Sequence, residues 1–190
     1  NFSDNVPGRE TMASSPSRSG ILGLLDHGSA LRTPAFQRSF AWEKEQVIDY
    51  WDDLARALDH VGGPSDYFLG LVVIDESGHI QDGQQRLATT LLLVSELYSA
   101  GEVAKSSEQH DAALARDVAA VLSPALRTTP NAPLTIGADD QRALIERTGI
   151  RVKALESVRR VEKAREEIRK LVQSDLSTRH KADERLRRLK

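Results

Sequence analysis

The sequence predicts a globular domain in which a few short β-strands pack against several helices. Of its 190 residues, 39% are hydrophobic and 28% are charged, which is typical of a folded chain and not of a disordered one. Two segments carry the prediction of mixed structure. Residues 67–74 (YFLGLVVI) form a continuous apolar run of strand length, and residues 43–61 repeat apolar side chains at the spacing of one helix face.

The other elements follow from the same patterns in chain order. Residues 1–18 are polar and rich in Ser and Pro, which predicts a flexible arm. Helices are predicted over residues 19–27, 43–61, 83–100, 108–122, 139–147 and 152–172, with a last helix beginning at residue 177. Strands are predicted over residues 67–74, 79–81 and 134–136, and residues 30–36 are predicted to form a short strand that runs into a loop. We therefore divide the chain into the arm 1–18, a domain over 19–149, and a basic helical extension over 150–190 that begins a further region of a longer protein.

Charge is distributed unevenly along the chain. Residues 1–149 carry 12 Lys and Arg against 21 Asp and Glu, whereas residues 150–190 carry 14 against 7. A basic tail after an acidic body is typical of contact with nucleic acid, and equally of a charged amphipathic helix that packs on another domain. The acidic body argues against a broad DNA-binding surface on the first domain, because neutralising phosphates requires clustered Lys and Arg.

Several residue types are absent or unpatterned, which excludes some classes of site. The chain has no cysteine, so it has neither disulfides nor thiolate metal sites, as expected of a cytoplasmic protein. It has no run of about 18 apolar residues, so no membrane span is predicted. The five histidines show no metal-ligand spacing and no His-Asn-His arrangement, so we expect no nuclease centre in this chain.

A first motif, residues 33–42 (TPAFQRSFAW), places three aromatic residues around a Gln-Arg pair just before the helix predicted at 43–61. Pro34 holds the chain extended where the motif begins. Stacking against aromatic rings fixes the guanidinium plane of Arg38 and leaves its N–H groups free for a phosphate or carboxylate. The plain alternative is that Phe36, Phe40 and Trp42 are core residues.

A second motif, residues 81–86 (QDGQQR), lies between a predicted strand and a predicted buried helix. Asp82 and Gln85 have the spacing of a capping box, and Gly83 permits a close approach of the backbone. The free N–H groups and positive dipole end of the helix, together with Arg86, favour an anion at this point. The plain alternative is an ordinary helix cap with a surface arginine.

With these two motifs the sequence resembles the ParB-like N-terminal domain of GmrSD-type modification-dependent restriction proteins, which include phosphorothioate-sensing relatives. The resemblance is specific over residues 31–97, weaker over 134–144, and does not extend beyond 150. It implies a compact α+β fold related to ParB and sulfiredoxin, with a small mixed sheet and surrounding helices. Phe36 stands where the family commonly has Tyr, and so lacks a hydroxyl. The matching residues are Pro34, Phe36-Gln37-Arg38, Phe40, Trp42, Phe68-Leu69-Gly70 and Asp82 to Arg86.

The resemblance also implies hydrolysis of a nucleoside triphosphate, with GTP as the expected substrate. The chain would then be a sensor of modified DNA that controls a nuclease domain of the same protein or of a partner subunit, in a possible homo-oligomer. The expected catalytic residues are Asp82, Gln85 and Arg86, with Asp82 holding Mg²⁺ or orienting the attacking water. The nucleotide would be bound by Gln37, Arg38, Gly83, Gln84 and Arg86. The residues expected to sense modified DNA are Pro34, Phe36, Gln37 and Trp42.

Two other functions remain open from the sequence. The aromatic-flanked segment is also consistent with a module that reads modified DNA, either base-modified or phosphorothioate, and hydrolyses nothing. A DNA nickase acting through the same fold is the second alternative, although the sequence shows no clustered carboxylates and no catalytic His pair for it.

Overall fold

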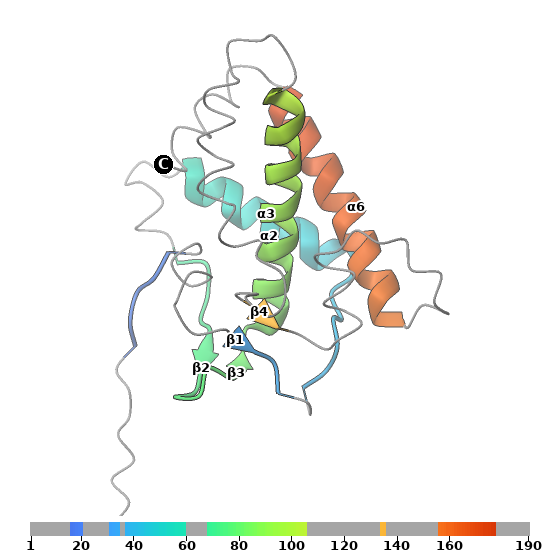
Figure 1. Cartoon of the computed structure of the whole chain (residues 1–190). Helices are drawn as coiled ribbons and strands as arrows, with labels where there is room; N and C mark the ends of the chain where they lie inside the picture. The colour runs from blue at the N-terminus through green and yellow to red at the C-terminus, as the bar shows by residue number, and fades with distance from the viewer. Residues whose placement is uncertain are drawn as a thin grey trace, which may run out of the picture.

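The structure combines three long helices with a small region of β-strand at the beginning of the central helix (Figure 1). It is a computed structural model that describes residues 16–20, 31–34, 37–59, 68–105, 134–135 and 156–177. The elements are β1 (Leu31–Arg32), α2 (Lys44–Asp59), β2 (Val73–Ile74), β3 (Ile80–Asp82), α3 (Gln84–Lys105), β4 (Leu134–Thr135) and α6 (Glu156–Ser177). The α+β fold class predicted from the sequence is thereby confirmed.

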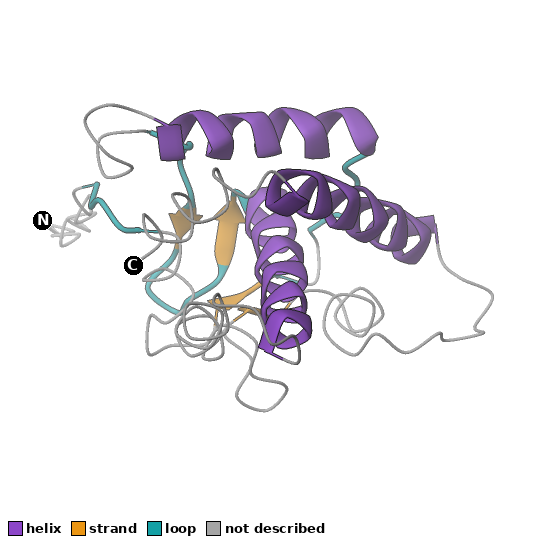
Figure 2. Cartoon of the chain, turned by 90° about the horizontal axis from the view of Figure 1, so that it is seen from above, coloured by secondary structure: helices purple, strands orange, loops and turns teal. Residues whose placement is uncertain are grey.

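Helix α3 is the centre of the molecule because most of its surface is apolar. Its residues Leu87, Leu91, Leu92 and Val94 are buried, and no acidic residue lies in its first turn. Helix α2 is amphipathic and turns one face, which includes the buried Val47, toward the core. Figure 2 shows α2 and α6 beside α3, and the hydrophobic core lies between the three helices.

Helix α6 belongs to the same core, although it lies within the predicted extension 150–190. The side chains of Val161, Ala164, Ile168 and Val172 recur at helical spacing and are all buried. They form one cluster with the buried residues of α2 and α3. The basic and acidic side chains of α6 number six and five. This balance shows that the excess positive charge of the tail does not come from α6.

Ion pairs hold α6 against both neighbouring helices. Arg160 Nε lies 2.7 Å from Glu43 Oε1 just before α2, and Lys44 Nζ lies 3.2 Å from Glu167 Oε1. On the other side, the carboxylate of Glu96 in α3 accepts hydrogen bonds from Arg165 and Arg169, each at 3.0 Å. Burial disfavours the charged form of Glu96, but the two arginines outweigh it, so the pKa of this carboxyl lies below its ordinary value.

The β-strands form two pairs that meet at one bridge. β1 and β4 are parallel, with Leu31 opposite Leu134, and β2 and β3 are antiparallel. A parallel bridge between Arg32 and His79 joins the pairs, and the Arg32 backbone N–H donates to the Gly78 carbonyl at 3.0 Å. Strand pairing therefore places β1, just before the first motif, beside the hairpin that leads into the second.

The strand predicted over 67–74 is much shorter than expected. Only Val73 and Ile74 pair with a neighbouring strand, and residues 68–72 are irregular. Two apolar side chains of this run point to solvent, Phe68 with 77% of its surface exposed and Leu71 with 56%. The prediction of a buried strand was wrong, and the cause lies in a contact of Gly70 described below.

The other predicted elements divide into confirmed and untested ones. The helices expected at 43–61, 83–100 and 152–172 are α2, α3 and α6, and the strands expected at 30–36, 79–81 and 134–136 are β1, β3 and β4. The helices predicted over 108–122 and 139–147, most of the one predicted over 19–27, and the last one from residue 177 lie outside the described residues. None of the described helices is long and apolar enough to cross a membrane.

Candidate functional site

The two sequence motifs meet at the start of α3, where Gln85 binds the loop of the first motif. Its side-chain Oε1 accepts a hydrogen bond from the Ala41 backbone N–H at 2.8 Å, and its Nε2 donates to the Ser39 carbonyl at 3.2 Å. Gln85 is buried, so both ends of its amide are used inside the protein. One side chain therefore fixes two backbone groups that are more than 40 residues away in the sequence.

Two further glutamines fix the same loop. Gln84 Nε2 donates to the Arg38 carbonyl at 2.7 Å, and Gln37 Nε2 donates to the Gln81 carbonyl at 3.1 Å. The segment that carries Arg38 is thus held on the end of β3 and the first turn of α3. The expected meeting of the two motifs is observed, but Gln37, Gln84 and Gln85 contribute to it as bonds between protein segments.

Helix α3 begins at a glycine, not at an aspartate. The Leu87 N–H donates to the Gly83 carbonyl at 3.0 Å, so Gly83 is the residue that caps the helix, and its φ is 89°. Asp82 lies one residue earlier, and its Oδ1 accepts from the Gly83 N–H at 2.7 Å. The predicted capping box of Asp82 with Gln85 was wrong, because the positive φ of Gly83 starts the helix one residue later than that motif requires.

This helix start leaves polar groups without partners. The backbone N–H groups of Gln84, Gln85 and Arg86 belong to the first turn, and within the part of the chain that the structure describes no acceptor binds them. The Oε1 atom of Gln84 is also buried without a partner, in a residue that is 8% exposed. Free N–H groups at the positive end of a long helix favour an anionic ligand.

Arg86 lies on the outside of this first turn and is bound by the segment before β2. Its Nη1 donates to the Leu71 carbonyl at 2.9 Å. Its guanidinium lies against Gly70, where a Cβ atom would be only 2.7 Å from Cζ. Arg86 is half-buried, and one of its five N–H donors is used by Leu71, which leaves the others for further acceptors.

Asp82 and Arg38 are the exposed charged residues of the site. The carboxylate of Asp82 points away from the core and keeps one oxygen without a described partner. The guanidinium of Arg38 forms no ion pair or hydrogen bond with any described residue, although its backbone carbonyl is fixed by Gln84. No group of three or more potential metal ligands occurs among the residues that the structure describes.

The aromatic residues of the first motif are placed by the core. The Trp42 and Tyr50 rings meet edge to face with centroids 5.6 Å apart, and Trp42 packs on the hydrophobic core. Tyr50 donates to Thr90 Oγ1 at 2.7 Å, since the single Thr90 proton goes to the Arg86 carbonyl. Burial raises the pKa of the Tyr50 phenol above its ordinary value.

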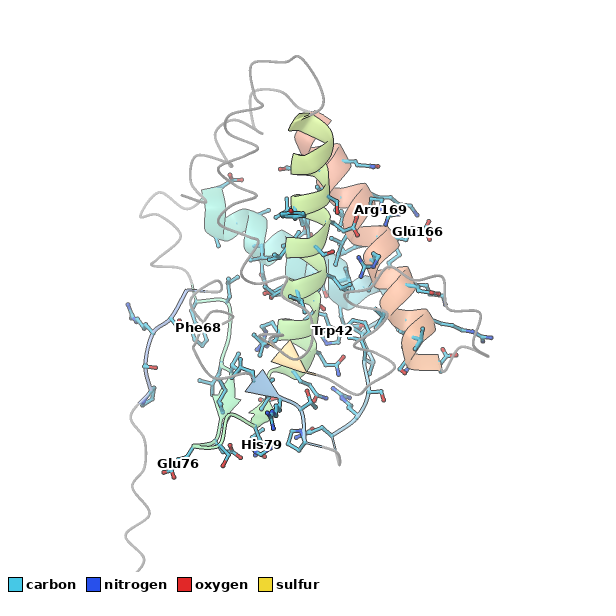
Figure 3. All side chains as sticks on the ribbon, viewed as in Figure 1. Trp42, Phe68, Glu76, His79, Glu166 and Arg169 are labelled. Carbon is cyan, nitrogen blue, oxygen red and sulfur yellow. The ribbon has the colours of Figure 1, made fainter. Side chains whose placement is uncertain are left out.

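The remaining residues predicted to sense modified DNA are placed less completely. The Pro34 carbonyl accepts from the Gln37 N–H at 3.0 Å and so closes a turn, whereas Phe36 lies outside the described residues. Figure 3 shows Trp42 and the exposed Phe68 on opposite sides of the beginning of α3. The grouping of Pro34, Phe36 and Trp42 into one sensing pocket therefore stays a prediction.

Comparison with known families gives one clear result. The sequence model of the GmrSD restriction endonuclease N-terminal domain matches residues 21–189. The chain belongs to this family. The match includes both motifs and also α6, which is consistent with the packing of α6 into the same core as α2 and α3. The GmrSD N-terminal domain assigns the chain to restriction proteins, and no curated protein matches it.

Proposed function

We propose that this GmrSD N-terminal domain binds and hydrolyses a nucleoside triphosphate at the start of α3. The observation that carries the proposal is the set of glutamine hydrogen bonds that holds the Arg38 loop on the first turn of α3. They hold the backbone of Arg38, whose exposed guanidinium has no described partner, against a helix end whose N–H groups have no described acceptor. A polyphosphate supplies the acceptor oxygens that both features lack.

The proposed roles follow from which groups remain free. The N–H groups of Gln84, Gln85 and Arg86 bind a phosphate, as at other helix N-termini. The charges of Arg38 and Arg86 stabilise the transferring phosphoryl group, for which catalysis depends on positioning and charge. Gln37 and Gln85 act indirectly, by fixing the loop, whereas Gln84 Oε1 is free to accept a hydrogen bond from the nucleotide or from water.

Asp82 is the residue proposed to hold Mg²⁺. Mg²⁺ usually binds proteins through one or two carboxylates and takes its other ligands from substrate phosphates and water. One free carboxylate oxygen beside a phosphate site fits this pattern. Bound there, Mg²⁺ would neutralise charge on the phosphates, and Asp82 would hold it or orient the attacking water.

We propose further that nucleotide hydrolysis reports modified DNA to a nuclease domain elsewhere in the same protein or in a partner subunit, in the cytoplasm. Support comes from the restriction family, in which DNA is the target. GTP is the proposed nucleotide. The sensing residues proposed are Pro34, Phe36 and Gln37, with Trp42 contributing through the position of the loop because its ring packs on the core.

A phosphate-release assay of the purified protein tests the proposal against its alternatives. Each of the four ribonucleoside triphosphates is supplied with Mg²⁺ or with EDTA, with and without phosphorothioate or base-modified DNA. We expect Mg²⁺-dependent release, greatest with GTP and changed by one class of modified DNA. DNA binding without phosphate release would instead indicate the reader module, and nicking of DNA would indicate the nickase.

Two pairs of variants locate the activity. Asp82→Asn and Arg38→Ala should each lower kcat on the order of 100-fold, because each removes a charge that acts in the transition state. The matched controls are Asp52→Asn, an exposed carboxylate on α2, and Arg159→Ala, whose exposed pair with Glu156 contributes little. Equal kcat values for a site variant and its control would reject the assigned role.

A further inference from the structure

We infer that Gly70 is a positioning residue of the proposed nucleotide site, and that it acts by leaving room for the guanidinium of Arg86. This inference rests on the proposed function, in which Arg86 supplies charge to the phosphates. It concerns a residue outside both motifs, 16 positions before the arginine. Gly70 lies in the irregular segment before β2, against the side chain of Arg86 in the first turn of α3.

A side chain at Gly70 would conflict with its backbone conformation and with the position of the Arg86 guanidinium. A Cβ atom built on Gly70 would lie 2.7 Å from Cζ and 2.9 Å from Nη1 of Arg86, shorter than a Cβ atom adopts in proteins. The φ of Gly70 is 125°, a conformation that other residues rarely adopt. The positive φ therefore favours glycine at this position, and a Cβ atom there would displace the guanidinium of Arg86.

The Leu71 carbonyl and Gly70 together hold the guanidinium of Arg86, and we call this pair of contacts its seat. Arg86 Nη1 donates to the Leu71 carbonyl at 2.9 Å. The position of the guanidinium is therefore set by this hydrogen bond and by its close approach to Gly70. A flexible arginine loses much of its side-chain freedom on binding a ligand, and a seat of this kind removes part of that freedom beforehand. The charge of Arg86 is thereby presented at one place beside the free N–H groups of α3.

The exposed apolar side chains around Gly70 follow from the same contact. The Leu71 carbonyl binds Arg86, and on either side of Gly70 the side chains of Phe68 and Leu71 face solvent. The segment pairs as a strand only from Val73 onward. Residues 68–72 are thus not paired as a strand where the chain contacts Arg86, and Phe68 and Leu71 are exposed there, whereas Val72 packs on the core.

A double-mutant cycle tests the inference. Gly70→Ala should lower kcat about 100-fold with a much smaller change in KM, because a displaced charge near the reacting group is costly even when the shift is about 1 Å. In the Arg86→Ala background the same substitution should change kcat less than twofold, since the group that Gly70 seats is gone. Additive effects, or a wild-type kcat in Gly70→Ala, would overturn the inference.

Control variants distinguish the effect of losing the Gly70–Arg86 contact from the effect of placing alanine at a positive φ angle. Gly78→Ala meets a positive φ of 82° in the β2–β3 turn, away from Arg86, and Gly20→Ala meets open space. Both should keep kcat near the wild-type value. Arg86→Lys keeps the charge but not the planar guanidinium, so its kcat should also be lower than that of the wild type. This variant still tests the inference if Gly70→Ala does not fold. Wild-type kcat in Arg86→Lys would contradict the role of the seat.

A second readout does not depend on turnover. The free energies of unfolding of the four proteins in the cycle should also be non-additive, with Gly70→Ala less destabilising once Arg86 is alanine. If the wild-type protein releases no phosphate, the proposed function fails, while the unfolding cycle still decides whether Gly70 seats Arg86. Additive free energies would show that the contact is absent in solution.

Discussion

Gln85 is buried at the start of α3, and both ends of its side-chain amide bind the loop that carries Arg38. Gln85→Ala should destabilise the protein by about 2 kcal/mol, because it leaves the Ala41 N–H and the Ser39 carbonyl without partners. It should also lower phosphate release, since the loop is no longer held on the helix. Urea unfolding gives the first quantity, and the phosphate assay gives the second.

Gln173→Ala is the matched control for this change, because Gln173 is an exposed glutamine in the interior of a helix. Its free energy of unfolding should stay within about 0.5 kcal/mol of the wild type. A Gln85→Ala protein as stable and as active as this control would show that the loop is held by other contacts.

At the scale of single residues, the sequence predicted the meeting of the two motifs but not the way they meet. The Gln-Arg pairs indicated an anion site near a helix start, and hydrogen bonds do join the two motifs there. Spacing alone could not show that Gly83, and not Asp82, caps the helix, because this depends on one positive φ angle. That shift by one residue turns Gln85 from a cap into the side chain that binds the loop.

At the scale of elements, the pairing of α3 with α6 depends on one buried carboxylate. Glu96 is 4% exposed and binds both Arg165 and Arg169, of which Arg165 is also buried. Glu96→Gln should destabilise the protein by about 3 kcal/mol near neutral pH, because it removes the negative charge that pairs with the buried Arg165. Chemical denaturation of the variant beside the exposed-surface control Glu162→Gln measures this loss.

The same pair predicts a dependence on pH. The pKa of Glu96 is lower in the folded protein than the ordinary value of 4.5, so its contribution is present above that value and is lost as the pH falls through the lower, folded pKa. The difference in stability between wild type and Glu96→Gln should therefore shrink as the pH is lowered from about 7 to below about 4. A difference that stays constant over this range would mean that Glu96 is not ionised in the folded protein.

The elements also show where reading a sequence pattern fails. The helices α2 and α6 were predictable because their apolar residues repeat at a fixed spacing on one face. The run YFLGLVVI has the composition of a buried strand, and only its last two residues pair. The deciding interaction is the long-range contact of Gly70 with Arg86, which local composition does not contain.

At the scale of the whole molecule, the family match and the packing agree on the extent of the domain. The match continues to residue 189, and α6 places four side chains in the core shared with α2 and α3. The boundary predicted at residue 149 rested on a change of charge composition. Charge composition is a property of exposed side chains, whereas the extent of a domain is set by the buried ones.

A protein that ends at residue 149 provides the decisive comparison. Its loss of α6 exposes the apolar face of α3, and each large buried aliphatic side chain contributes about 1.5–3 kcal/mol. Three such residues of α6, Val161, Ile168 and Val172, then account for much of a domain's total stability of about 5–15 kcal/mol. The shortened protein should show no cooperative melting by circular dichroism, whereas Ile168→Ala in the intact chain should still fold and lose about 3 kcal/mol. Cooperative melting of the shortened protein at the wild-type temperature would instead support the predicted boundary at residue 149.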